Sequence, residues 1–288
     1  MKEKLKKNLI KILQNKGISK IFRIFGRTVK GNIIYFIRDD INRNYAKILA
    51  ENTKYDIKSI ENLLNKIELV QRNVHCAHGQ YEFYVMQAMI LNLPIDGPII
   101  ELGCYKGGST AKLSLICKLT GRELYAFDSF EGLPAPSKQD LKHEYTPIIY
   151  PKKSVSYVAG EYTGSLEEVK RNVSKFGSIE ICKFIKGRFE DTLPNFNVKP
   201  ACIFMDVDYI ESARTAIKFL WPRLSPGGLF FSHESGVLDF IKAITDQDWW
   251  KKEMNQPPPL IYGAGYGTCW RYNKIAFPSN IMFFKKLI

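Results

Sequence analysis

The chain has 288 residues, 45% of them hydrophobic, which is enough for one large domain with a sizeable core and an appendage. Of its lysines and arginines, 17 fall in the first 75 residues against 7 acidic residues, so most of the net charge of +13 lies there. A near-neutral body does not favour nucleic-acid binding. The six scattered cysteines favour neither disulfides nor a zinc site, and we expect a cytoplasmic protein.

The chain is predicted to begin with a basic helical extension over 1–75, followed by the main domain over 76–288. Two apolar stripes in the extension have helical spacing. They consist of Ile18, Ile21, Phe22 and Phe25, and of Ile60, Leu63, Leu64 and Ile67. Such basic helices either make peripheral contact with an anionic membrane or pack on their own domain or on a second copy in a homo-oligomer. No apolar stretch at the N-terminus is long enough to span a bilayer.

A further helix is predicted over 80–93, ended by Pro94 and Pro98, after which strand and helix patterns alternate. The predicted strands are 98–103, 123–128, 181–187, 201–208 and 227–233, and the predicted helices between them are 109–119, 165–176 and 212–221. This alternation predicts an α/β fold, a doubly wound and mostly parallel sheet of the Rossmann-like type. The long irregular segment 129–164 is typical of a binding loop or lid, and the aromatic tail 246–288 is predicted to pack over the sheet's edge.

The sharpest motif is a glycine-rich turn between the first strand and the following helix. Gly103, Gly107 and Gly108 form a G-x-x-x-G-G pattern preceded by Glu101, and Asp128 ends the next strand. An acidic residue at that place can bind ribose hydroxyls. A dinucleotide needs G-x-G-x-x-G, whereas a carboxylate before the turn suits the ammonium of S-adenosylmethionine. We therefore expect S-adenosylmethionine, with a nicotinamide-dependent oxidoreductase as an alternative and a purely structural glycine turn as another.

Taken together, six motifs resemble the macrocin O-methyltransferase family over roughly residues 97–232. They are ELGCYKGGS, FDSFEGLP, SLEEVKRNVSKFG, KGRFEDTLP, MDVDYIES and PRLSPGG, in the order and spacing of that family. The resemblance implies a class I methyltransferase that uses S-adenosylmethionine, requires a metal and methylates sugar hydroxyls of natural products. The N-terminal 75 residues and the long loop resemble the family poorly.

The resemblance also implies roles for individual residues. The implied cofactor-binding residues are Glu101, Gly103 and Ser109 toward the methionine end, Asp128, Ser129 and Phe130 around the ribose, and Arg188 and Phe189 near the adenine. The turn itself adds Gly107 and Gly108, whose backbone amides can approach a ligand at the helix N-terminus, and the carboxyl end of the fourth strand adds Asp206. Asp208 matches the family's metal-binding carboxylate, which also takes the substrate proton. For Phe189, an ordinary place in the core is an equal alternative.

The chain departs from the family after its fifth strand, where Ser232-His233-Glu234-Ser235 replaces a pair of aspartates. Asp208, His233 and Glu234 could still hold a divalent metal such as magnesium or manganese, although imidazole shifts the preference from magnesium toward manganese, iron or zinc. Alternatively the metal is absent and His233 is the catalytic base, or His233 only caps the strand.

The sequence thus predicts an O-methyltransferase in which Asp208 and His233 activate a hydroxyl of a sugar or glycan-type acceptor. His143 and Tyr145 of the long loop are predicted to close over the substrate. A second alternative is a binding module that keeps the cofactor pocket but has lost turnover. The expected partner is a small-molecule or glycan acceptor.

Overall fold

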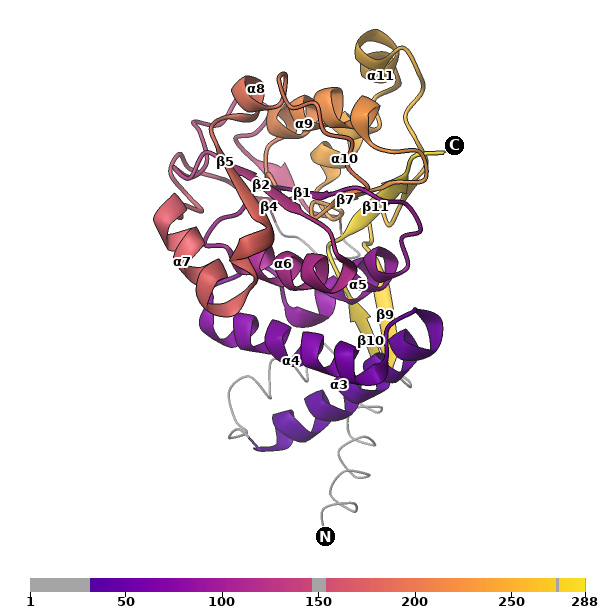
Figure 1. Ribbon diagram of the computed structural model, residues 1–288. Helices are drawn as coiled ribbons and strands as arrows, with labels where there is room; N and C mark the ends of the chain where they lie inside the picture. The colour runs from indigo at the N-terminus through magenta and orange to yellow at the C-terminus, as the bar shows by residue number, and fades with distance from the viewer. Residues whose placement is uncertain (1–31, 147–153, 273–274, 288) are drawn as a thin grey trace. The chain divides into compact units, whose positions relative to one another are not determined.

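A computed structural model of the chain describes residues 32–146, 154–272 and 275–287 (Figure 1). The first apolar stripe, 18–25, therefore lies outside the described residues. The chain forms two compact units: the smaller comprises the described residues up to Leu64 with Cys269–Phe277, and the larger comprises Asn65–Thr268 with the described residues from Pro278 onward. The division between these units falls within one helix, and the predicted boundary after residue 75 stays a prediction. Within the described residues, no helix combines the length and the apolarity needed to cross a bilayer.

The smaller unit is built from helices and a hairpin. It contains α3 (Asn32–Asn52), the first half of α4 (Ile57–Asn73), and the hairpin strands β9 (Cys269–Tyr272) and β10 (Ile275–Pro278). Tyr45 of α3 meets Trp270 of β9 edge to face, with ring centroids 5.4 Å apart. The side chains of the second predicted stripe are all buried.

The larger unit is organised around a seven-stranded sheet with the order β5-β2-β1-β6-β7-β11-β8. The strands are β1 (Ile99–Leu102), β2 (Leu124–Asp128), β5 (Cys182–Lys186), β6 (Cys202–Met205), β7 (Leu229–Ser232), β8 (Ile261–Tyr262) and β11 (Met282–Lys285). The first five of these pair in parallel, and β11 is antiparallel to both of its neighbours. The predicted doubly wound, mostly parallel sheet is confirmed, and the aromatic tail extends its edge with two strands.

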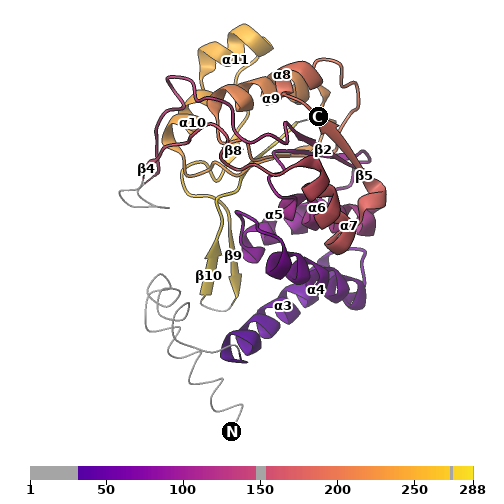
Figure 2. The same ribbon diagram turned by 90° about the vertical axis from the view of Figure 1, so that its left-hand side faces the viewer.

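Helices cover both faces of this sheet. They are α5 (Phe83–Leu91), α6 (Gly108–Thr120), α7 (Leu166–Phe176), α8 (Phe189–Thr192), α9 (Ile210–Arg223), α10 (Leu238–Ile244) and α11 (Gln247–Met254), with short 3-10 turns η1 (Gln80–Glu82) and η2 (Ile179–Ile181). Figures 1 and 2 show α5, α6 and α7 on one face and α8, α9 and α10 on the other. The long loop adds a small hairpin, β3 (His143–Glu144) with β4 (Ser154–Val155).

One helix runs further than the sequence pattern predicts. The helix expected to stop at Trp221 continues to Arg223 and includes Pro222. Proline removes one amide donor from a helix, but the helical hydrogen bonding resumes beyond Pro222, because the Leu224 amide donates to the Leu220 carbonyl at 2.8 Å.

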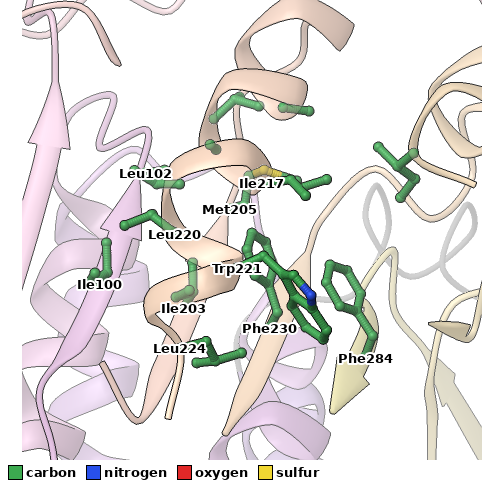
Figure 3. Packing of buried hydrophobic residues seen from close by; sticks show 14 of the residues in the cluster. Ile100, Leu102, Ile203, Met205, Ile217, Leu220, Trp221, Leu224, Phe230 and Phe284 are labelled. Atoms are coloured by element: carbon green, nitrogen blue, oxygen red, sulfur yellow. The ribbon is translucent and has the colours of Figure 1, made fainter. Parts of the chain in front are cut away.

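The main core lies between the sheet and α9 (Figure 3). It includes Ile100, Leu102, Ile203, Met205 and Phe230 from the sheet, Ile217, Leu220 and Trp221 from α9, Leu224 directly after α9, and Phe284 from β11. Phe230 and Phe284 stack across neighbouring strands with ring centroids 4.6 Å apart. Each such side chain contributes about 1.5–3 kcal/mol on burial, so the central strands are held firmly and present their carboxyl ends in fixed positions.

Candidate active site

A cavity of about 800 Å³ lies at the carboxyl ends of the central parallel strands. Gly103 follows β1, Asp128 ends β2 and Asp206 follows β6, and all three line the cavity. The strand order reverses between β1 and β6, and open α/β sheets bind their ligands at such a reversal. The volume lies within the range of about 300–1,000 Å³ that small-molecule sites occupy. All of its lining residues belong to the larger unit.

The glycine turn is shaped by close backbone contacts. Gly103 has φ +89°, and a Cβ added there would lie 2.0 Å from the Asp206 carbonyl oxygen, so only glycine is accommodated. Gly108 and Ser109, which begin α6, line the cavity. Gly107 does not; it is the left-handed N-cap of α6 and packs against Val169. Gly107 was predicted to contact the cofactor, but it lies off the cavity, because its left-handed backbone conformation forms the turn into α6.

Asp128 holds this turn while facing the cavity. Its Oδ2 accepts hydrogen bonds from the Cys104 amide at 2.6 Å and the Tyr105 amide at 3.3 Å, and its Oδ1 accepts from the Phe130 amide at 2.7 Å. Burial raises the pKa of this carboxyl, and the amide hydrogen bonds oppose that rise. A carboxylate offers about four acceptor positions, so Asp128 can still accept from a ribose hydroxyl.

Glu101 lies behind the wall of the cavity. It is fully buried in β1 and is absent from the cavity lining. Among the described residues its Oε1 has no hydrogen-bond partner, and burial raises its pKa to about 8. Glu101 was predicted to contact the methionine ammonium directly, but its side chain does not reach the cavity, because every residue of this central strand is buried.

The residues predicted near the ribose and adenine separate into two groups. Ser129, Arg188 and Phe189 line the cavity. Phe130 does not, and its side chain is buried with its backbone in the left-handed region at φ +58°. Its amide, not its ring, serves the site, because that amide donates to Asp128.

A compact polar cluster stands on the cavity wall beside the end of β6. Asp206 Oδ2 lies 2.8 Å from His78 Nε2, and Asp206 Oδ1 lies 3.3 Å from His233 Nδ1. The two imidazole rings meet edge to face with centroids 4.2 Å apart. Among the described residues, one ligand atom from each of these three side chains lies within 4.8 Å of the others, a spacing that could hold a metal ion.

Charge interactions in the cluster are strong. Burial and the neighbouring His233 act to lower the pKa of His78, but Asp206 outweighs them and raises it to about 9. Burial would likewise lower the pKa of His233, and Asp206 with Glu82 raises it well above its usual range. Burial would raise the pKa of Asp206, but the two histidines hold it far below its ordinary value. The cluster therefore binds either protons or a cation between its nitrogens and carboxylate.

Asp208 and Glu234 serve different purposes. Asp208 lines the cavity with φ +61°, a strained conformation for a non-glycine residue, and its carboxylate bonds to the Tyr157 hydroxyl. Burial and the charge of Asp206 raise its pKa to about 7. Glu234 is buried off the cavity, and its Oε1 accepts from the Val207 amide at 2.8 Å. The predicted metal set of Asp208, His233 and Glu234 thus differs from the converging set, because Glu234 is turned inward to backbone amides.

The macrocin-O-methyltransferase family (TylF) matches residues 80–272, about two thirds of the chain. The chain belongs to this family. It is an S-adenosylmethionine-dependent O-methyltransferase, which decides against the nicotinamide-dependent alternative.

Several proteins are similar to this macrocin-family enzyme. The 8-demethyl-8-(2,3-dimethoxy-alpha-L-rhamnosyl)-tetracenomycin-C 4'-O-methyltransferase of Streptomyces olivaceus is 27% identical over 190 residues, covering 62% of this chain and 67% of its own. The mycinamicin III 3''-O-methyltransferase of Micromonospora griseorubida is 27% identical over 146 residues, covering 46% of this chain and 53% of its own. The chain therefore aligns with about half the length of the second relative. The solved structure of the O-methyltransferase NovP has a TM-score of 0.48 and 20% identity, with 81% of both chains covered.

Two further residues of this macrocin-family enzyme differ from or extend the sequence prediction. Tyr145 lines the cavity, but His143 is fully buried and its Nε2 lies 3.5 Å from Asp140 Oδ1, so it does not face the substrate space. His78 was missed by the sequence interpretation. It stands in a short segment before η1 with no periodic pattern, and the only local signal is its place among His75 and Cys76.

Proposed function

We propose that the enzyme transfers the methyl group of S-adenosylmethionine to a hydroxyl of a sugar or glycan-type acceptor. The observation that carries this proposal is that Asp128 and the polar group of Asp206, Asp208 and His233 face one cavity. A cofactor bound at Asp128 would thus have its reactive end near groups that can bind and deprotonate a hydroxyl. By name, both relatives are O-methyltransferases, and the first acts on a compound that carries a rhamnosyl group, which supports a sugar acceptor.

The proposed cofactor contacts follow from the cavity wall. Asp128 would accept hydrogen bonds from the ribose hydroxyls, and Arg188 with Phe189 would flank the adenine. The first turn of α6 has no side-chain cap at Gly107, so the amides at Gly108 and Ser109 are suited to the methionine carboxylate. This set supports an amino-acid-bearing nucleoside as ligand.

The proposed reaction is a direct displacement. The acceptor oxygen attacks the methyl carbon, the carbon–sulfur bond breaks with its electron pair going to sulfur, and S-adenosylhomocysteine leaves. The hydroxyl proton passes to the carboxylate of Asp208, which faces the cavity with the Tyr157 hydroxyl as its partner. Holding both reactants in line supplies much of the acceleration. A divalent ion, when bound beside these groups, would polarise the acceptor oxygen.

Calorimetry with S-adenosylhomocysteine tests the cofactor part of the proposal. Asp128→Asn removes a charge-assisted hydrogen bond to the ribose, worth about 1.5–3 kcal/mol, so the Kd should rise about 10- to 100-fold. The matched control is Asp191→Asn, an exposed carboxylate absent from the cavity lining, which should leave the Kd unchanged. Equal affinities of wild type and Asp128→Asn would refute the role of Asp128.

The acceptor is tested by incubating the enzyme and S-adenosylmethionine with rhamnosides, nucleotide-linked sugars and a catechol. Mass spectrometry should detect an added methyl group on one or more sugars, and Asp208→Asn should lower the rate at least 100-fold. Methylation of the catechol alone would overturn the sugar proposal.

A further inference from the structure

We propose that His78, Asp206 and His233 form a site for a divalent first-row transition metal such as Mn²⁺, Co²⁺ or Zn²⁺, in preference to Mg²⁺. The inference deepens the proposed function and rests on it for the role of the ion. It changes the ligand set expected from the sequence, because His78 and Asp206 take the places of Asp208 and Glu234 beside His233. His78 also lies just before residues 80–272, the part of the chain that the family matches.

The spacing of the ligand atoms around Asp206 fits a single metal ion. Two adjacent ligands at about 2.1 Å from one ion are about 3 Å apart. The two contacts of Asp206 use both of its oxygens and are close to this separation, at 2.8 Å from Oδ2 to His78 Nε2 and 3.3 Å from Oδ1 to His233 Nδ1. Two histidines and one carboxylate are also the composition of the facial triad that binds transition metals.

In each imidazole ring, the nitrogen that faces away from Asp206 already has a partner. His233 Nε2 lies 3.1 Å from Glu82 Oε2, and Glu82 is itself fixed because its Oε1 accepts from the Gly79 amide at 2.9 Å. His78 Nδ1 lies 3.4 Å from Cys76 Sγ. Metal-bound histidines characteristically donate their other N–H to a carboxylate, a backbone carbonyl or water, as His233 can to Glu82, which fixes the tautomer and orients the ring. The nitrogens left over are the two that face Asp206.

The cluster is open toward the cavity. His78, Asp206 and His233 all line the cavity, and the side chains of Asp206 and His233 keep 19% and 16% of their exposure. Three protein ligands with open positions toward a substrate cavity are typical of catalytic metal sites. The remaining positions would thus face the acceptor hydroxyl.

The choice of metal follows from the donors. Magnesium prefers oxygen ligands and keeps several of its waters, whereas two of the three donors here are imidazole nitrogens. A set with this composition should bind manganese, cobalt or zinc more tightly than magnesium.

The test uses the full chain after removal of bound metal with a chelator. Equilibrium dialysis with elemental analysis should find one Mn²⁺ or Zn²⁺ per chain, and Mg²⁺ should bind at least 100-fold more weakly. With Co²⁺, the visible spectrum should show ligand-field bands that His78→Ala and His233→Ala abolish. Each of these variants should lower the Mn²⁺ affinity at least tenfold. The matched control is His75→Ala, an exposed histidine three residues from His78 and outside the cluster, which should leave that affinity within twofold.

Binding of S-adenosylhomocysteine, measured on the same variants, shows that each is folded. If His78→Ala keeps this binding and loses Mn²⁺, the metal site is supported whether or not sugars are methylated. The proposal is overturned if wild type binds no transition metal, if Mg²⁺ binds equally well, or if His78→Ala and His75→Ala behave alike. Should His78→Ala fail to fold, Glu82→Gln replaces it and should weaken Mn²⁺ binding through His233. Methyl transfer without metal binding would refute this site and leave the proposed function intact.

Discussion

At the scale of single residues, the larger unit carries ionisable groups in its interior. The hydrogen-bond partners of each group decide how much its burial destabilises the folded protein. Lys112 of α6 is fully buried, but its Nζ donates to Gln71 Oε1 at 2.6 Å and to the His78 carbonyl at 3.2 Å. Glu101 is equally buried, and its Oε1 has no partner among the described residues. Burial disfavours the ionised form of Glu101 more than the hydroxyls of Ser109 and Thr110 favour it, so Glu101 should be neutral in the folded protein.

A substitution at Glu101 tests this conclusion. Burial raises the pKa of Glu101 to about 8 from an ordinary 4.5, so between these values the folded protein holds a proton that the unfolded chain has released. The free energy of unfolding should therefore fall as the pH rises from about 4.5 to 8 and then level off. Glu101→Gln should match wild type near pH 5 and exceed it near pH 8.5 by on the order of 3–4 kcal/mol.

Urea denaturation without cofactor at both pH values measures the difference. Glu167→Gln, at an exposed position, is the control and should follow the wild-type curve. A constant offset between Glu101→Gln and wild type at every pH would show that Glu101 is ionised in the folded state.

Residues at strand ends could be placed from the sequence, and residues brought in by packing could not. Asp128, Asp206 and Asp208 follow buried strands, so their convergence at one edge of the sheet was predictable. His78 lies 128 residues from Asp206, and only tertiary packing brings them together. Glu234 could not be placed either: a glutamate is a possible metal ligand, but its Oε1 accepts hydrogen bonds from the Val207 and Asp208 amides.

At the scale of elements, the five parallel strands were predictable because each is a short apolar run followed by a helix. The strands β8 and β11 were not, since they are short and pair antiparallel with segments distant in sequence. Local periodicity carries no information on such partners. The tail was predicted to pack over the sheet's edge, and in the structure it adds the strands β11 and β8 to that edge.

The turn after β1 gives an element-scale prediction. In Gly103→Ala, the new Cβ would meet the Asp206 carbonyl, so the turn and the end of β6 must separate. We expect a loss of at least about 3 kcal/mol in the free energy of unfolding together with loss of S-adenosylhomocysteine binding. Gly121→Ala is a matched control, because Gly121 also has a positive φ of +71° but no atom within 4 Å of its added Cβ.

The control should lose only the cost of left-handed backbone, about 1–2 kcal/mol, and should bind ligand as wild type does. Urea denaturation and calorimetry measure both variants. Equal losses in the two would mean that backbone strain, not the contact with Asp206, fixes the turn.

At the scale of the whole molecule, function and charge are separated along the chain. The cavity is lined by the larger unit, while most of the positive charge lies in the first 75 residues. Peripheral membrane contact and homo-oligomerisation through that basic extension stay predictions from the sequence. What the structure adds is that one unit contains every group assigned to the cofactor, so ligand binding should be linked to that unit's stability.

Hydrogen exchange can measure this linkage. At a concentration of S-adenosylhomocysteine about 100 times its Kd, the ligand-bound unit gains about 2.7 kcal/mol, because the ligand binds only the folded form. Protection should rise at 103–109, 128–133 and 187–190, which border the cavity, whereas amides of α3 in the smaller unit should exchange as before. Asp128→Asn at the same ligand concentration should lose about 1.3–2.3 kcal/mol of that gain, because its Kd is expected to be 10- to 100-fold higher. An equal rise in α3 would mean that both units open in a single cooperative step, since a ligand protects only those amides whose opening also disrupts its site.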